Sequence, residues 1–423
     1  MDPSTKNWLA LYIDEFQESI AADSSKLALY LGNYTEMMDF CHFYLHDSGL
    51  FYGHIVAHKF GTFANSESWS GADNFKIAVV EGLVLTYLFS QKQRVLQGES
   101  YGTIAQECVE KLYEFYVLFT MNDVQSSKYR TIFLKNQDKT TAVEQVLDGR
   151  VSNPSMLERD FWKGSQFNIF TALDVMYFAY WMQGIYEYDH RNRIKNEIVS
   201  LMDKASRVEK KSNKNGLSTV SYFIASGNFG GAGDYVAQNE INFSESRSKD
   251  SAFTRRIIYE YAVYVCLVDN QLEYKEVDFL QKTAAQLSVT ESEEQESLFM
   301  IDSFLANHAE HIFYLQYGEG VNLIRKAFNM RFQSFVTKNK AKIVEEILES
   351  KELVELLRKA VSENLSDEEK QKVRSQIADL LKTIPSLAIF MIPGGSIILP
   401  FLLKILPEEI LMPSSFINKK NEK

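Results

Sequence analysis

Proline is distributed very unevenly along this chain of 423 residues, which has seven prolines in total. Five of the seven lie in one apolar stretch, residues 384–416, together with the pair Gly394-Gly395. The rest of the chain is therefore almost free of the residue that breaks helices most strongly. This distribution favours long helices over sheets with many turns, so we expect an all-α protein made of several helical bundles.

Length and composition also limit the class of protein. A chain of 423 residues is too long for one ordinary core, and its 13% of aromatic residues predicts cores rich in rings. The formal net charge of −11 argues against a protein that coats nucleic acid, and we expect no DNA partner.

The cysteines and the N-terminal sequence indicate the compartment. Cys41, Cys108 and Cys266 form no CxxC pair and cannot all be bridged, which predicts core thiols in a reducing environment. The opening sequence MDPSTKNWLALYIDEF has no basic segment followed by an unbroken apolar run, so we expect no secretory signal. We therefore expect a protein that is not secreted and whose N-terminal bulk faces the cytoplasm.

Residues 1–203 are predicted to form an N-terminal helical domain. Apolar residues recur there at helical spacing, as at Ile104, Cys108, Leu112, Phe115 and Phe119. Residues 167–186 are apolar and long enough to cross a bilayer, but they contain Asp174, and a carboxylate at the centre of a bilayer is costly. A buried or groove-lining helix is the favoured interpretation of that segment.

Three further regions are predicted. Residues 204–250 are polar and contain a glycine-rich loop at 226–235 whose spacing fits neither the dinucleotide fingerprint nor the phosphate loop, which indicates linker and loops. Residues 251–335 have the pattern of a helical hairpin that turns near Asp269. Residues 336–423 contain a charged amphipathic helix, a capping box at Ser366 and an apolar segment at 383–406.

The apolar segment has three interpretations. Residues 383–403 carry no charge, and as a helix they would be about 31 Å long, which just spans a hydrocarbon core. Prolines kink any helix that they enter, although membrane helices tolerate them when neighbouring groups satisfy the freed carbonyls. We expect a membrane span or a dip into one leaflet, and a hairpin buried in protein is the alternative.

The same region carries a recognisable signature. It consists of an ADL triplet, two spaced prolines, an LP pair, a lysine, another proline and a closing PS-F. The signature residues are Asp379, Pro385, Pro393, Gly394, Gly395, Pro400, Lys404, Pro407, Pro413 and Phe416. On these residues the chain resembles the LETM family, the leucine-zipper/EF-hand-containing transmembrane proteins, and within it a bacterial LETM-related group described as biofilm-associated.

The resemblance implies residence in a membrane, a role in exchanging potassium or calcium for protons, and binding to the ribosome. Ser396 stands where mitochondrial members often place a glutamate, so a titratable group expected for proton coupling is missing at that position. No EF-hand calcium loop is found in the sequence.

A second, shorter similarity concerns residues 267–293, which resemble the helical hairpin of TerB-like tellurite-resistance domains. Asp269, Glu273 and Glu276 are the acids that match this pattern. In such domains the acids are candidates for binding a divalent cation, and a solvated acidic turn is the alternative.

Four of the seven histidines cluster near the N-terminus as two i, i+4 pairs. The pairs are His42 with His46 and His54 with His58. Each pair places two imidazoles on one helical face, where they can share a metal ion. Cys41, Asp39 or Asp47 would complete the coordination shell of that ion. The alternative is an aromatic-rich core with partly exposed imidazoles, and His308 and His311 have the same two interpretations.

No nucleophile elbow, kinase motif set or supported pair of catalytic acids is found, so we expect no enzyme and no cofactor other than a divalent cation. The first hypothesis is a non-enzymatic protein of the cytoplasmic membrane with an interaction or scaffold role. Its expected partners are membrane lipid, other proteins or further copies of itself. The resemblance adds the ribosome as a partner. One alternative is an oligomeric cation/proton exchanger in which Asp379 and Lys404 are the ionisable groups. A soluble helical scaffold is the other.

Overall fold

The computed structural model describes most of the first 362 residues and seven positions beyond them. The gaps in residues 1–362 are 23, 61–68, 98, 100, 123–128, 153–166, 186–190, 209–218, 221, 224–242, 244–248, 269–271, 313–314 and 316–339, and the later described positions are 365, 366, 369, 372, 373, 376 and 406. These residues form helices and no strand, apart from one isolated bridge between Ser152 and Phe167. The predicted all-α fold is confirmed.

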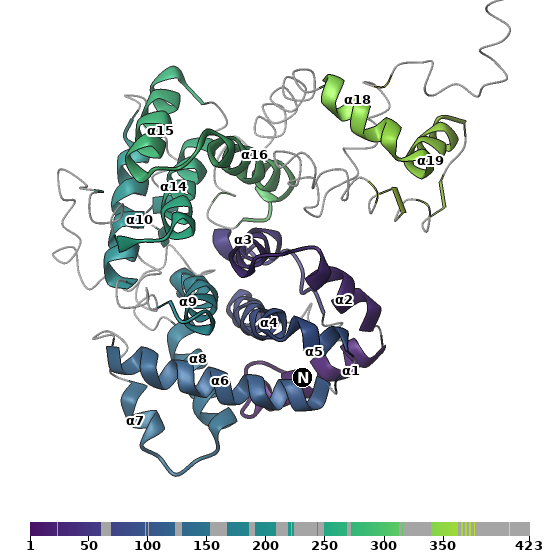
Figure 1. Ribbon diagram of the computed structural model, residues 1–423. Helices are drawn as coiled ribbons and strands as arrows, with labels where there is room; N and C mark the ends of the chain where they lie inside the picture. The colour runs from purple at the N-terminus through teal and green to yellow at the C-terminus, as the bar shows by residue number, and fades with distance from the viewer. Residues whose placement is uncertain are drawn as a thin grey trace, which may run out of the picture.

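The first part of the chain folds into helices that surround α4 (Figure 1). Their bounds are α1 Trp8–Ala22, α2 Ser24–Gly32, α3 Met37–Asp47, η1 Leu50–Tyr52, α4 Gly71–Ser90, α5 Lys92–Leu96, α6 Tyr101–Asn122, α7 Arg130–Phe133, α8 Lys139–Val151, η6 Ile169–Ala172 and α9 Leu173–Met182. Every residue of α4 from Phe75 to Phe89 is buried, as expected for a helix that is apolar on all sides. Helices α3, α6, α8 and α9 all pack against it.

Gly82 allows this close packing around α4. A Cβ atom at that position would lie 2.5 Å from a ring carbon of Tyr44 on α3 and 2.9 Å from a methyl carbon of Val175 on α9. Distances this short do not occur between real Cβ atoms and their neighbours, so a larger residue would force α3 or α9 away from α4. The glycine therefore sets how near the two neighbouring helices approach the central one.

The second group of helices packs beside the first. Its members are α10 Arg191–Ser206, α14 Ala252–Leu267, α15 Tyr274–Leu287 and α16 Glu291–His308. Helix α14 is buried along most of its length and lies against α10, α15 and α16. One core of buried apolar residues extends from Trp8 to Leu315 and so includes both groups of helices. The boundaries predicted at 203 and 250 stay predictions, but α10 and α14, which flank the predicted linker, pack directly on each other.

Several predicted elements can be compared with the structure. The five residues of the predicted apolar stripe in 104–119 are all buried on α6. The apolar run 167–186 forms an α-helix shorter than the run itself, because the one-turn η6 precedes α9. Both elements are buried in protein, as the polar residues of this segment predicted.

The last described helices are α18, Lys340–Glu349, and α19, Lys351–Ser362, which pack on each other. A single helix was predicted here, but Ser350 divides it, and its Oγ accepts a hydrogen bond from the Leu353 N–H at 3.3 Å. The predicted capping box is confirmed: the Ser366 N–H donates to Glu369 and the Glu369 N–H donates to the Ser366 hydroxyl. The apolar segment 383–406, except Leu406, lies outside the described residues. Within the described part of the chain, no helix combines the length and apolarity needed to cross a bilayer.

Candidate metal centre

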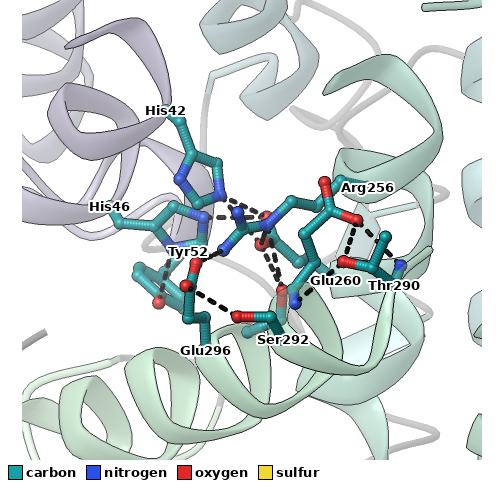
Figure 2. A network of polar contacts seen from close by, with 10 residues as sticks. His42, His46, Tyr52, Arg256, Glu260, Thr290, Ser292 and Glu296 are labelled. Atoms are coloured by element: carbon teal, nitrogen blue, oxygen red, sulfur yellow. Dashed lines mark hydrogen bonds and ion pairs between the residues drawn. The ribbon is translucent and has the colours of Figure 1, made fainter. Parts of the chain in front are cut away.

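Two imidazoles and one carboxylate meet where α3 faces α14 (Figure 2). His42 and His46 come from α3, and Glu260 comes from the middle of α14. Because His42 and His46 are four residues apart on a helix, they share one face, and their ring centroids are 4.8 Å apart. The Glu260 side chain has no exposed surface, that of His46 is 1% exposed and that of His42 is 12% exposed. The three groups therefore form a polar cluster inside the helical body.

The two carboxylate oxygens of Glu260 face different partners. Oε2 lies 3.0 Å from Nε2 of His42 and 3.1 Å from Nε2 of His46. Oε1 accepts from the Ser297 hydroxyl at 2.6 Å and from Nε of Arg256 at 3.0 Å, and it also lies 2.8 Å from Nε2 of His42. Arg256 extends the cluster to Glu296, whose Oε2 lies 3.1 Å from the guanidinium. Both oxygens of Glu260 thus have partners, and Oε2 is the one shared by the two imidazoles.

A short turn after α3 orients His46. Tyr52, at the end of η1, has its hydroxyl 2.8 Å from Nδ1 of His46, and Phe51 stacks on the same ring at 4.3 Å between centroids. Gly49 and Gly53 flank η1 with φ values of 86° and 65°, in the left-handed region that favours glycine. A Cβ on Gly49 would lie 1.8 Å from the carbonyl oxygen of His54. These glycines are what let the chain turn tightly enough to bring Tyr52 back to His46.

The charges of the cluster follow from burial and proximity. Burial alone would raise the pKa of Glu260, but His42 and His46 hold that pKa well below its usual value. Burial lowers the pKa of His42 to about 4, although Glu260 opposes the shift. At neutral pH the carboxylate is therefore ionised and the His42 imidazole is neutral, which are the protonation states that bind a metal ion.

The structure separates the residues predicted to complete a metal shell. Asp47 points to Lys59, with 2.7 Å between its Oδ2 and the ammonium nitrogen, and Cys41 is buried in the apolar core. Nε2 of His58 lies 3.2 Å from Oδ1 of Asn74 on α4. Among the described residues, His42, His46 and Glu260 are the one group of three such side chains close enough to share an ion.

Sequence reasoning missed Glu260. The residue is 218 positions away from His42, so no local spacing connects the two. The signal that was present is a single acid inside an otherwise apolar run of α14, IIYEYAVYVCL, because a buried carboxylate needs partners.

His54 belongs to a separate cluster with His308 and His311, at 6.4 Å from each between ring centroids. Burial, followed by these two imidazoles, lowers the pKa of His54 to about 4, below the value of about 6.5 expected in an unfolded chain. Between those two values the unfolded state binds a proton that the folded state does not, so acid destabilises the fold.

We expect the free energy of unfolding to fall between pH 7.5 and pH 5, with His54 responsible for about 1 to 2 kcal/mol of the loss. Urea unfolding at both pH values measures this loss of free energy in the wild type and in His54→Gln. The difference between the losses of the two proteins is the contribution of His54. Equal losses in the two proteins would contradict it.

The acids of the predicted TerB-like hairpin have a role in helix α15. Glu276 is buried, and its carboxylate accepts a hydrogen bond from the Glu273 N–H at 3.0 Å, which caps the start of the helix. Asp269 lies outside the described residues. The TerB-like similarity and the cation proposed for these acids stay predictions.

Comparison with known families concerns the other end of the chain. Residues 365–423 match the family model described as LETM1-like, RBD. Because of this similarity, residues 365–423 are called the LETM1-like domain. It contains all ten signature residues from Asp379 to Phe416, so the predicted LETM resemblance is confirmed, while the biofilm-associated type stays a prediction. Comparison with curated proteins and with solved structures gives no match. The LETM1-like domain is therefore joined to a helical body that the comparisons leave unassigned.

Proposed function

We propose that this protein is a non-enzymatic, membrane-associated scaffold, in which the C-terminal LETM1-like domain attaches the helical body to the cytoplasmic membrane. The observation that supports the proposal is the family match at residues 365–423, which includes the uncharged run 383–403. A run of that length is long enough to enter or cross the hydrocarbon core. The helical body would then be held at the cytoplasmic face.

The helical body is suited to an interaction role. The largest buried side chains of its core are mostly tyrosines, and its helices are joined by one continuous apolar core. A body of this kind holds its surface in a fixed shape, which a scaffold requires. The name of the matched model, which ends in RBD, makes the ribosome one partner to test.

The proposal is tested by alkaline carbonate extraction of membranes from cells that make the full chain or a chain ending at Lys382. We expect the full chain to stay with the membrane pellet and the shorter chain to be released. A double variant, Phe390→Lys with Ile397→Lys, should also be released, because each charge placed near the centre of a span costs about 2.5 to 3.5 kcal/mol.

The matched control is Phe390→Leu with Ile397→Leu, which changes the same positions and keeps them apolar. Release of the full chain together with both double variants would contradict the proposal and would place the proline-rich segment inside protein. The ribosome is tested in membrane pellets prepared at neutral pH, which are probed for ribosomal proteins. Equal amounts of ribosomal protein in pellets from cells with the full chain and from cells with the chain ending at Lys382 would argue against the ribosome as a partner.

A further inference from the structure

We propose that His42, His46 and Glu260 bind one divalent transition-metal ion, of which Zn²⁺ is the best fit, inside the helical body. The proposal concerns a site far in sequence from the LETM1-like domain and does not depend on membrane attachment. It rests on the donor types, their geometry, the groups that orient them and the charge around them.

The donor set selects a class of metal. Two imidazole nitrogens and one carboxylate oxygen suit Zn²⁺ and its first-row neighbours, whereas Ca²⁺ and Mg²⁺ prefer shells built from oxygen alone. Three protein ligands leave one position of a tetrahedral ion for water.

The spacing of the donors fits one ion. Oε2 of Glu260 lies 3.0 and 3.1 Å from the two Nε2 atoms, and all the ligand atoms of the group lie within 4.8 Å of one another. Metal bonds of about 2.0 to 2.2 Å place neighbouring ligands roughly 3 to 3.5 Å apart. Small rotations of side chains that already point at one another would therefore be enough to admit the ion.

Neighbouring groups direct the donor atoms toward the centre. The Tyr52 hydroxyl at Nδ1 of His46 can accept a hydrogen bond from that nitrogen, which leaves the lone pair of Nε2 for a metal. Ser297 and Arg256 hold Oε1 of Glu260, which also lies 2.8 Å from Nε2 of His42, and Oε2 faces both imidazoles. This is the arrangement in which outer groups fix the orientation of metal ligands.

The local charge also favours a cation. Arg256 is the positive group of the cluster, and it faces two carboxylates, those of Glu260 and Glu296. Asp39 on α3 lies within electrostatic reach of the same guanidinium. The carboxylates of this region outnumber its guanidinium groups, and a divalent ion would offset the excess negative charge. The partly exposed edge of His42 gives the route by which an ion would enter.

The alternative is a cluster held by hydrogen bonds alone, in which both imidazoles donate to Glu260. To decide between the two, the full chain is purified in mild detergent, stripped with a chelator, dialysed and titrated with Co²⁺ and with Zn²⁺. Elemental analysis should find one ion per chain. The Co²⁺-loaded protein should show the visible absorption bands of Co²⁺ bound by four or five nitrogen and oxygen ligands. Zinc is also expected to raise the thermal unfolding temperature.

Variants identify the ligands. His42→Gln and Glu260→Gln should lose the Co²⁺ bands and the zinc-dependent rise in unfolding temperature, and Tyr52→Phe should weaken binding by about 10- to 100-fold. His58→Gln is the matched control, because its imidazole bonds to Asn74 and is not one of the three proposed ligands, and it should bind as the wild type does. Circular dichroism shows which variants are folded.

One measurement needs no variant. X-ray absorption of the zinc-loaded wild type should count two imidazole ligands on the metal. Absence of stoichiometric uptake by the wild type, a count other than two imidazoles, or unchanged binding in folded Glu260→Gln would each overturn the site. Because these readouts come from the helical body, they remain valid whether or not the chain is released by carbonate.

Discussion

Replacing Asp174 with asparagine is expected to destabilise the helical body by about 3 to 5 kcal/mol. Asp174 on α9 is fully buried, and its two oxygens accept from Nη2 and Nε of Arg150 on α8 at 2.5 and 2.6 Å. The Tyr116 hydroxyl donates to the same carboxylate at 3.2 Å. Asparagine removes the negative charge that faces the Arg150 guanidinium in this two-bond pair, and the guanidinium is mostly buried. Removing one partner of a buried ion pair is among the costliest changes that a substitution can make.

Urea unfolding followed by circular dichroism measures this loss. The matched control is Asp278→Asn on α15, since that carboxylate pairs with Lys282 at the surface and should contribute less than about 1 kcal/mol. A double variant, Arg150→Met with Asp174→Leu, should recover most of the lost stability, because it removes both charges together. A loss below about 1 kcal/mol for Asp174→Asn would show that the pair does not hold α8 against α9.

Asp174 also shows how far sequence reasoning extends. A carboxylate within an apolar run indicated that residues 167–186 are buried in protein, and η6 and most of α9 within that range are buried. The sequence could not identify its partner, because Arg150 reaches it only after the chain folds α8 back on α9. The same applies to the metal centre, where the spacing of His42 and His46 was visible and Glu260 was not.

Local signals predicted local features well. The stripe on α6, the hairpin helices α14 and α15, and the Ser366 capping box all depend on residues within one or two turns of each other. The break at Ser350 was missed because the apolar periodicity continues through it, whereas the structure begins a new helix with the Ser350 hydroxyl as its cap. Contacts between distant segments, by contrast, depend on the arrangement of whole helices, which periodicity does not specify.

Replacing Glu81 with alanine should have an effect of similar size, about 3 to 5 kcal/mol, through unsatisfied hydrogen-bond donors. Glu81 is fully buried on α4, and its carboxylate accepts from the N–H groups of Lys59 and Phe60 at 2.8 and 2.9 Å and from the Tyr44 hydroxyl at 3.0 Å. Alanine would remove the acceptor of the two N–H groups, at a cost of about 1 to 3 kcal/mol for each one that stays buried, whereas the Tyr44 hydroxyl keeps the Ala78 carbonyl at 2.7 Å. The exposed Glu114→Ala on α6 is the control, with an expected loss below about 1 kcal/mol.

The same substitution links the core to the metal centre. Glu81 anchors the end of the extended segment that follows η1, and η1 carries Tyr52 to His46. If this anchor positions Tyr52, a folded Glu81→Gln variant should bind Co²⁺ more weakly than the wild type, even though Glu81 does not touch His42, His46 or Glu260. Unchanged Co²⁺ affinity in that variant would mean that Gly49, Gly53 and the stacking of Phe51 on His46 are sufficient to hold the turn.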